Sequence, residues 1–216
     1  MKTSIRLTSL AFLVLAVSLP TSAALAQTKI AFVTSETTDG SIDEPGFATG
    51  IASADAICNR LAAAASPATI SASAVADGFK AWLSDSSSSP LSTFTQATVP
   101  YVLVGGTQIA PNWTGLVDGL LDEPIRLSEH GVQPAPPLNS VQVWTYTSAS
   151  GADAGHGFNC LNWTDQSNVQ FGGYGLSSHA IGSWTDSSAR VCWELRHLYC
   201  FQQGSLPVEL QSFSID

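Results

Sequence analysis

Four cysteines stand behind an export signal, and they constrain the fold of this 216-residue chain more than any other feature. An exported chain meets an oxidising compartment, where cysteines form disulfides rather than catalytic thiols or metal ligands. Four cysteines allow three pairings, and the sequence alone does not choose between them. A nested arrangement would pin the two ends of the domain and hold the long loop between the middle two. The cysteines are Cys58, Cys160, Cys192 and Cys200.

Residues 1–26 have the three parts of a secretory signal peptide. Lys2 and Arg6 give a positive start, an apolar stretch follows, and Ala24-Leu25-Ala26 is a cleavage pattern before Gln27. The apolar stretch is too short for a membrane anchor, which needs about 20 residues. We therefore expect export to the periplasm or the extracellular space, with no membrane span. Residues 27–204 are expected to form one domain, followed by a C-terminal tail at 205–216.

The net charge of the chain disfavours one class of partner. The formal net charge is −9, and loss of Lys2 and Arg6 with the signal peptide makes it −11. Nucleic acid and anionic lipid are bound through Lys and Arg side chains that neutralise phosphate. We therefore expect no nucleic-acid partner.

Apolar periodicity predicts a mixture of helices and strands. A helix over 53–65 places Ala54, Ile57, Cys58, Leu61 and Ala65 on one stripe, with Ser53 as its N-cap. A second, short helix begins after Asn112. Residues 148–183 lack periodicity, and a segment of that kind inside a domain is functional or held by cross-links. Strands are predicted at 29–34, 79–83, 101–104, 125–127, 141–146, 191–195 and 198–201.

An ordered set of short motifs resembles endostatin, the C-terminal domain of certain vertebrate collagens. The set includes Ser53 to Cys58, Gly78 to Ser84, Asn159-Cys160-Leu161-Asn162-Trp163, and Cys192 followed after seven residues by Cys200. The chain is more similar still to a bacterial family of exported proteins and lipoproteins of unknown function. That family shares the Phe32-Val33-Thr34-Ser35 start and the Leu198-Tyr199-Cys200-Phe201 end.

The resemblance implies an α+β, C-type-lectin-like fold with two helices, mixed antiparallel strands and a long irregular loop. It also implies the nested disulfides, Cys58 with Cys200 and Cys160 with Cys192. Endostatin's zinc site uses histidines near its N-terminus, and this chain has none there. That site is therefore not carried over.

C-type lectins bind sugars through calcium, and this chain departs from their ligand pattern. Gln133-Pro134-Ala135 lacks the carboxylate of the family's first motif, and Trp184-Thr185-Asp186 has Thr in place of an Asn ligand. We therefore expect no cofactor, with calcium as the less favoured alternative. The four histidines do not have the spacing of metal ligands. Asp153, His156 and Asp165 share the long loop and could converge, but we expect no metal there. The candidate ligand-binding residues are Trp163, Asp165, Trp184 and Asp186, which flank that loop.

Catalytic motifs are missing from the sequence. There is no G-x-S-x-G elbow, no H-E-x-x-H and no phosphate loop. We therefore expect a non-catalytic protein that binds an extracellular polysaccharide or surface protein. One alternative is a structural or adhesion component of the cell surface without a small-molecule site. A second is an unrecognised hydrolase, since any two carboxylates can meet in space. The sequence does not indicate an oligomeric state.

Overall fold

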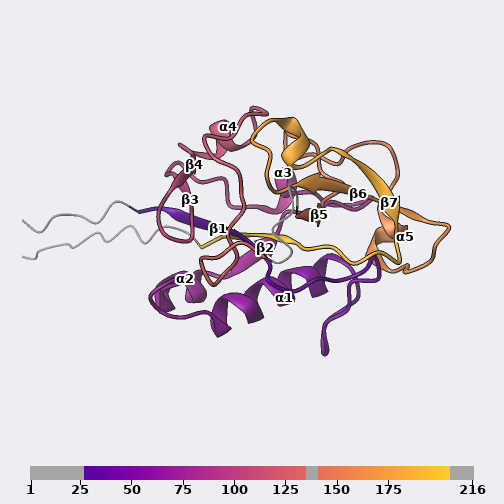
Figure 1. The fold of residues 1–216 in the computed structure, drawn as a ribbon, viewed down its shortest axis with the longest axis horizontal. Coiled ribbons are helices and arrows are strands. Elements are labelled where there is room, and N and C mark those ends of the chain that lie inside the picture. The colour runs from indigo at the N-terminus through magenta and orange to yellow at the C-terminus, as the bar shows by residue number, and fades with distance from the viewer. Residues whose placement is uncertain (1–26, 135–140, 205–216) are drawn as a thin grey trace, which may run out of the picture.

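The computed structural model describes residues 27–134 and 141–204, and these residues form an α+β fold with two sheets (Figure 1). The predicted signal peptide at 1–26, residues 135–140 and the tail at 205–216 lie outside the described residues. Within the described part, no helix combines the length and apolarity needed to cross a bilayer.

The larger sheet has five strands in the order β2-β8-β1-β3-β4. Strand β1 pairs parallel with β3 and antiparallel with β8, and β8 also pairs antiparallel with β2. Val33, at the end of the first described strand, pairs with Tyr199, at the start of the last described strand. The bounds are β1 Lys29–Val33, β2 Phe79–Ala81, β3 Tyr101–Leu103, β4 Gln108–Ala110 and β8 Tyr199–Gln202.

The smaller sheet has the order β5-β6-β7, and both pairings are antiparallel. It lies beside the larger sheet on the right in Figure 1, away from the start of β1. Its strands are β5 Gln142–Trp144, β6 Phe171–Leu176 and β7 Ser188–Val191. The helices are α1 Ile51–Ala64, α2 Ala72–Asp77, α3 Pro90–Thr93, α4 Trp113–Leu116, α5 Cys160–Trp163 and the 3-10 helix η1 Gly182–Trp184.

Strands β1 and β8 are buried on both faces, which explains their near-continuous apolar sequences. Alternation sends Phe32 and Cys200 into a core that also holds α1. The neighbouring residues Val33, Tyr199 and Phe201 enter a second core on the other face, which also contains Trp82 and Trp184. Strands β1 and β8 therefore contribute side chains to both cores.

Two side chains of α1 take the place of a neighbouring strand at the edge of the larger sheet. Asp55 Oδ1 accepts from the Ala81 amide at 2.8 Å. Asn59 donates to the Phe79 carbonyl at 2.8 Å and accepts from the Phe79 amide, also at 2.8 Å. Since β2 is an edge strand, these bonds satisfy backbone groups that would otherwise be unpaired. Spacing of four residues puts both side chains on one face of the helix.

The disulfides join Cys58 to Cys200 and Cys160 to Cys192, which is the nested arrangement. The first closes 142 residues and fastens α1 to the middle of β8. The second closes 32 residues and fastens α5 to the end of β7. All four cysteines are buried.

Several predicted boundaries need correction. The long helix begins at Ile51, and Ser53 does not cap it, because its hydroxyl is buried and bonds Glu44 N and Ala48 O. Residues 125–127 are not a strand, although Leu127 O accepts from Val33 N at 2.9 Å. The strand predicted at 191–195 instead spans 188–191, so Trp193 and Leu195 are exposed. Strand β4 was not predicted, because Gln108–Ala110 is too short to show alternation.

Loss of the Cys58–Cys200 disulfide is expected to destabilise the domain more than loss of the other. In the chain-entropy model, closing 142 residues contributes about 5 kcal/mol, and closing 32 residues about 4 kcal/mol. Guanidinium unfolding of a Cys58→Ala/Cys200→Ala variant and a Cys160→Ala/Cys192→Ala variant measures both losses. A larger loss in the second variant would contradict this ranking.

Asp55 is expected to make stability fall as the pH rises. Burial raises the pKa of its carboxyl from 3.8 to about 6, against the opposing effect of the Ala81 amide. A raised pKa stabilises the fold fully below pH 3.8, and this contribution is lost as the pH rises to about 6. Asp55→Asn keeps an acceptor for Ala81 but does not titrate. Between pH 4 and 7, the free energy of unfolding of the wild type should therefore fall by up to about 3 kcal/mol relative to that of this variant.

Urea unfolding at several pH values measures this difference. Asp43→Asn is the matched control, because Asp43 is exposed and the variant removes one carboxylate by the same substitution. A constant difference between wild type and Asp55→Asn across this range would refute the assignment.

Candidate functional site

A groove of about 400 Å³ opens on one face of the smaller sheet. That volume lies within the range of ligand pockets, roughly 300–1,000 Å³. Its walls come from the loop before α5, the start of β6, the turn after η1 and strand β7. The lining residues are His156, Phe158, Phe171, Asp186, Ser188 and Ala189.

His156 is held in the groove by one ring nitrogen and by ring contacts. Nδ1 accepts a hydrogen bond from the Phe158 amide at 3.2 Å, so Nδ1 carries no proton. The proton of the neutral ring is therefore on Nε2, which lies 3.7 Å from Asp186 Oδ1. The Tyr146 ring meets the imidazole edge-on with centroids 5.0 Å apart. The Tyr146 hydroxyl accepts from the Gly157 amide at 3.2 Å, which braces the same loop.

Two phenylalanines give the groove an aromatic wall. The side chains of Phe158 and Phe171 are each 42 % exposed, with ring centroids 5.9 Å apart and planes at 53°. The His156 ring continues the series, with its centroid 4.9 Å from that of Phe158. Large aromatic side chains are seldom left this exposed in pairs without a partner, and such patches mark ligand or protein contacts.

Glycine at position 173 makes room for the imidazole. A Cβ there would lie 3.0 Å from His156 Cε1 and 3.1 Å from Tyr146 Cα. Both approaches are closer than ordinary van der Waals contact. Gly173, in the glycine-rich strand β6, therefore allows the His156 ring to pack closely against the sheet.

Helix α5 is a turn of left-handed helix. The φ values of Cys160, Leu161, Asn162 and Trp163 are 48°, 53°, 60° and 63°. This conformation costs about 1–2 kcal/mol per L-residue, so other interactions must hold it. The Asn159 side chain accepts from the Asn162 amide at 3.1 Å and caps the turn.

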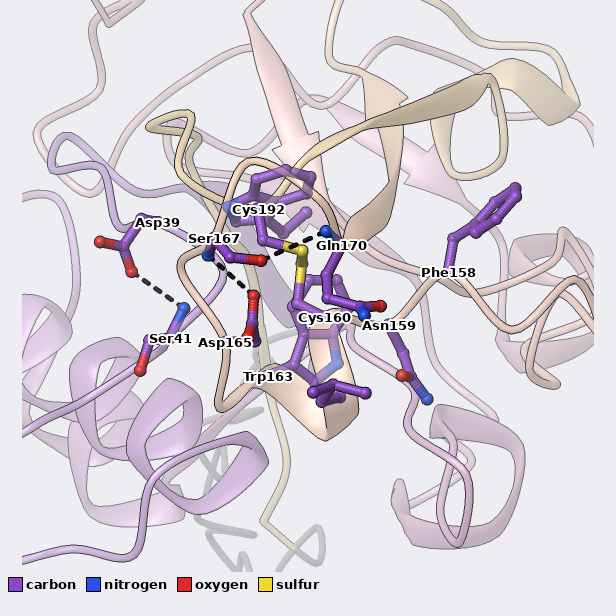
Figure 2. Close-up of a disulfide and its surroundings, with 12 residues drawn as sticks. Asp39, Ser41, Phe158, Asn159, Cys160, Trp163, Asp165, Ser167, Gln170 and Cys192 are labelled. Atoms are coloured by element: carbon purple, nitrogen blue, oxygen red, sulfur yellow. Dashed lines mark hydrogen bonds between the residues drawn. A yellow bond between two sulfur atoms is a disulfide. The ribbon is translucent and has the colours of Figure 1, made fainter.

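Both ends of this left-handed turn are anchored in the core. Cys160 is bonded to Cys192, and the buried Trp163 indole donates to the Ser84 carbonyl at 2.7 Å. Figure 2 shows Trp163 below the disulfide, while Phe158 lies to its right with the ring directed away from it. The disulfide thus joins the segment that carries His156 and Phe158 to the end of β7, where Val191 pairs with Phe171.

The four predicted ligand-binding residues do not meet in one pocket. Trp163 and Trp184 are fully buried, so the prediction that their rings stack on a ligand is corrected. Trp163 packs on Trp144 with centroids 5.8 Å apart, and Trp184 packs on Trp82 with centroids 5.0 Å apart. The sequence identified aromatic residues next to an irregular loop, but it gave no information on which face they occupy.

The two predicted aspartates have different environments. Asp165 Oδ1 accepts from the Ser167 amide at 2.7 Å in a turn, as drawn in Figure 2. Asp186 lines the groove. Asp186 is therefore the member of the predicted set that the groove contains. Phe158 and Phe171 were missed, because nothing in the sequence distinguishes an exposed phenylalanine from a buried one.

Of the residues that could hold calcium or another metal, Ala135 lies outside the described part, and the others have different partners. The Thr185 hydroxyl is buried, accepts from the Trp82 indole at 2.7 Å and donates to the Thr147 carbonyl at 2.7 Å. It is thus committed to the core. Asp153 and Asp165 each accept from a backbone amide two residues ahead, and His156 faces Asp186 instead. No group of three His, Cys, Asp or Glu suited to a metal occurs among the described residues.

Comparison with known proteins does not assign the chain to a group. It matches no protein-family model and no curated protein.

Replacing Leu161 by glycine is expected to stabilise the protein. Leu161 has φ 53° and ψ 53°, and its side chain is 55 % exposed, so little packing is lost. Relief of the left-handed conformation outweighs the extra entropy of glycine in the unfolded chain by roughly 0.5–1 kcal/mol. Leu91→Gly is the matched control, because Leu91 is exposed in the right-handed helix α3. Leu91→Gly should lower the free energy of unfolding by about 1 kcal/mol. Guanidinium unfolding measures both, and equal losses would contradict the left-handed assignment.

Proposed function

We propose that this protein is an exported, non-catalytic binding domain of C-type-lectin-like fold that holds a carbohydrate residue in the groove around His156. The observation that carries the proposal is a pair of exposed phenylalanine rings beside a carboxylate. Aromatic faces pack against the C–H faces of sugar rings, and a carboxylate accepts from sugar hydroxyls. The two disulfides fit an oxidising compartment, and their nested pairing supports the lectin-like assignment.

Binding in this groove would not need calcium. Asp186 faces His156 rather than a second carboxylate, and the Thr185 hydroxyl is committed to core hydrogen bonds. The groove thus offers ring faces, one imidazole N–H and one carboxylate. That mixture of an apolar wall with few polar groups is typical of small-ligand sites.

The hydrolase alternative is less well supported, although Ser188, His156 and Asp186 all line the groove. Nδ1 of His156 accepts from the Phe158 amide, and Nε2 already carries the ring proton, so neither nitrogen is free to take a serine proton. Register adds a second argument. Ala189 pairs with Gly173, on the His156 face, and alternation turns the Ser188 side chain to the other face.

A structural or adhesion role is a second candidate, favoured by a separate observation. Trp193 and Leu195 follow β7 and are 59 % and 64 % exposed. Exposed tryptophan is enriched among the residues that dominate protein–protein contacts. A surface protein bound there would leave the groove free, so Trp193→Ala separates this role from sugar binding.

The carbohydrate proposal is tested with the exported chain, purified with intact disulfides, on a glycan panel with calcium and then with chelator. Phe158→Ala is expected to weaken binding by between about twofold and tenfold, since an aromatic contact contributes about 0.5–1.5 kcal/mol. Chelator should have no effect. Phe47→Ala is the matched control, because Phe47 is exposed but does not line the groove.

Three results would overturn the proposal. They are a panel without any binding, loss of binding in chelator, and equal loss in Phe47→Ala and Phe158→Ala. Glycan binding that is lost in Trp193→Ala and kept in Phe158→Ala would also overturn it, because the sugar would then bind near Trp193 and not in the groove.

A further inference from the structure

We infer that the groove selects a sugar residue with a free ammonium group, that is, a cationic amino sugar such as a glucosamine unit. This inference rests on the proposed function and concerns the same groove. It adds the charge of the ligand, which follows from the charges around His156.

The groove carries one negative charge. Among the described residues that line it, Asp186 is the one with a charged side chain, and that side chain is 39 % exposed. His156 is neutral in the arrangement described above, because Nδ1 accepts from the Phe158 amide. Its Nε2 lies 3.7 Å from Asp186 Oδ1, beyond normal hydrogen-bond distance. The Asp186 carboxylate therefore has room to accept from a further donor.

The nearby arginines lie on the other face of the smaller sheet. Arg190 lies over the Tyr174 ring at 5.9 Å from the centroid, and Arg196 lies over the same ring at 5.2 Å. Tyr174 follows Gly173 in β6, so its side chain points away from the face that holds His156. These two guanidinium groups are thus directed away from the groove, and Asp186 is left as its fixed charge.

The aromatic wall suits a cation as well as a sugar ring. An ammonium within about 6 Å of a ring centroid is attracted by the negative π face. Phe158 and Phe171 form a wedge with centroids 5.9 Å apart, and it lies next to the carboxylate. A glucosamine unit has C–H faces for the rings and an ammonium for Asp186. An N-acetyl group offers no charge to that carboxylate.

The overall charge of the chain acts in the same direction. A net charge of −9 attracts cationic polymers and lowers the local concentration of acidic ones. Uronic acids and sulfated sugars would place a second negative charge beside Asp186. The charges in and around the groove therefore favour amino sugars over neutral sugars, and neutral sugars over acidic ones.

The test compares the tetramer of glucosamine with the tetramer of N-acetylglucosamine, by titration calorimetry near neutral pH and low salt. Wild type is expected to bind the glucosamine tetramer about fivefold tighter, the effect of one partly exposed ion pair. Asp186→Asn should remove this preference and leave the affinity for the acetylated tetramer within about twofold. Asp43→Asn, the matched control, removes one exposed carboxylate outside the groove and should keep the preference.

The outcomes separate the two proposals. If the acetylated tetramer or a neutral glycan binds as tightly as the glucosamine tetramer, the amino-sugar inference is overturned and carbohydrate binding stands. A preference that persists in Asp186→Asn also overturns the inference, because the charge then acts elsewhere. If neither tetramer nor any glycan of the panel binds, both proposals are overturned.

Discussion

The fold depends on the bond between Cys200 and Cys58, because Cys200 lies in the strand through which the larger sheet is connected. Strand β8 pairs with β1 on one side and with β2 on the other. The disulfide fixes α1 against this strand, and Asp55 and Asn59 of the same helix then satisfy the edge of β2. The helix thus acts as a covalently attached neighbour of the sheet. Without it, β2 would expose its edge and the core around Phe32 would lose one side.

The second disulfide has a different role, since it shapes the candidate site. It joins the left-handed turn to the end of β7, and the buried Trp163 fixes the other end of that turn. His156 and Phe158 come from the residues just before the turn. Phe171 pairs with Val191 at the end of β7. The two walls of the groove are therefore held together through one covalent link. Strain at the turn is tolerated because anchors on both sides determine its conformation.

Sequence patterns predicted the parts of this protein that follow regular periodicity. The stripe around Ile57 and Leu61 predicted α1 to within two residues of its start, and alternation identified the strands around Phe32 and Phe79. The candidate site was predicted only in part, because it is built from irregular segments. Whether Trp163 or Phe158 faces the solvent depends on a left-handed turn that Cys192, distant in sequence, stabilises. Local sequence does not contain that information, so Asp186 was found and the aromatic wall was not.

A groove held in this way is suited to binding. Ordering side chains and loops on association opposes affinity, and a site whose walls are already fixed avoids much of that cost. His156 illustrates this, because its ring is held by the Phe158 amide, the Tyr146 ring and the space left by Gly173. A catalytic histidine needs a nitrogen free to accept and release a proton, whereas this one uses its contacts to stay in place. The same contacts that weaken the case for catalysis thus strengthen the case for a preformed ligand site.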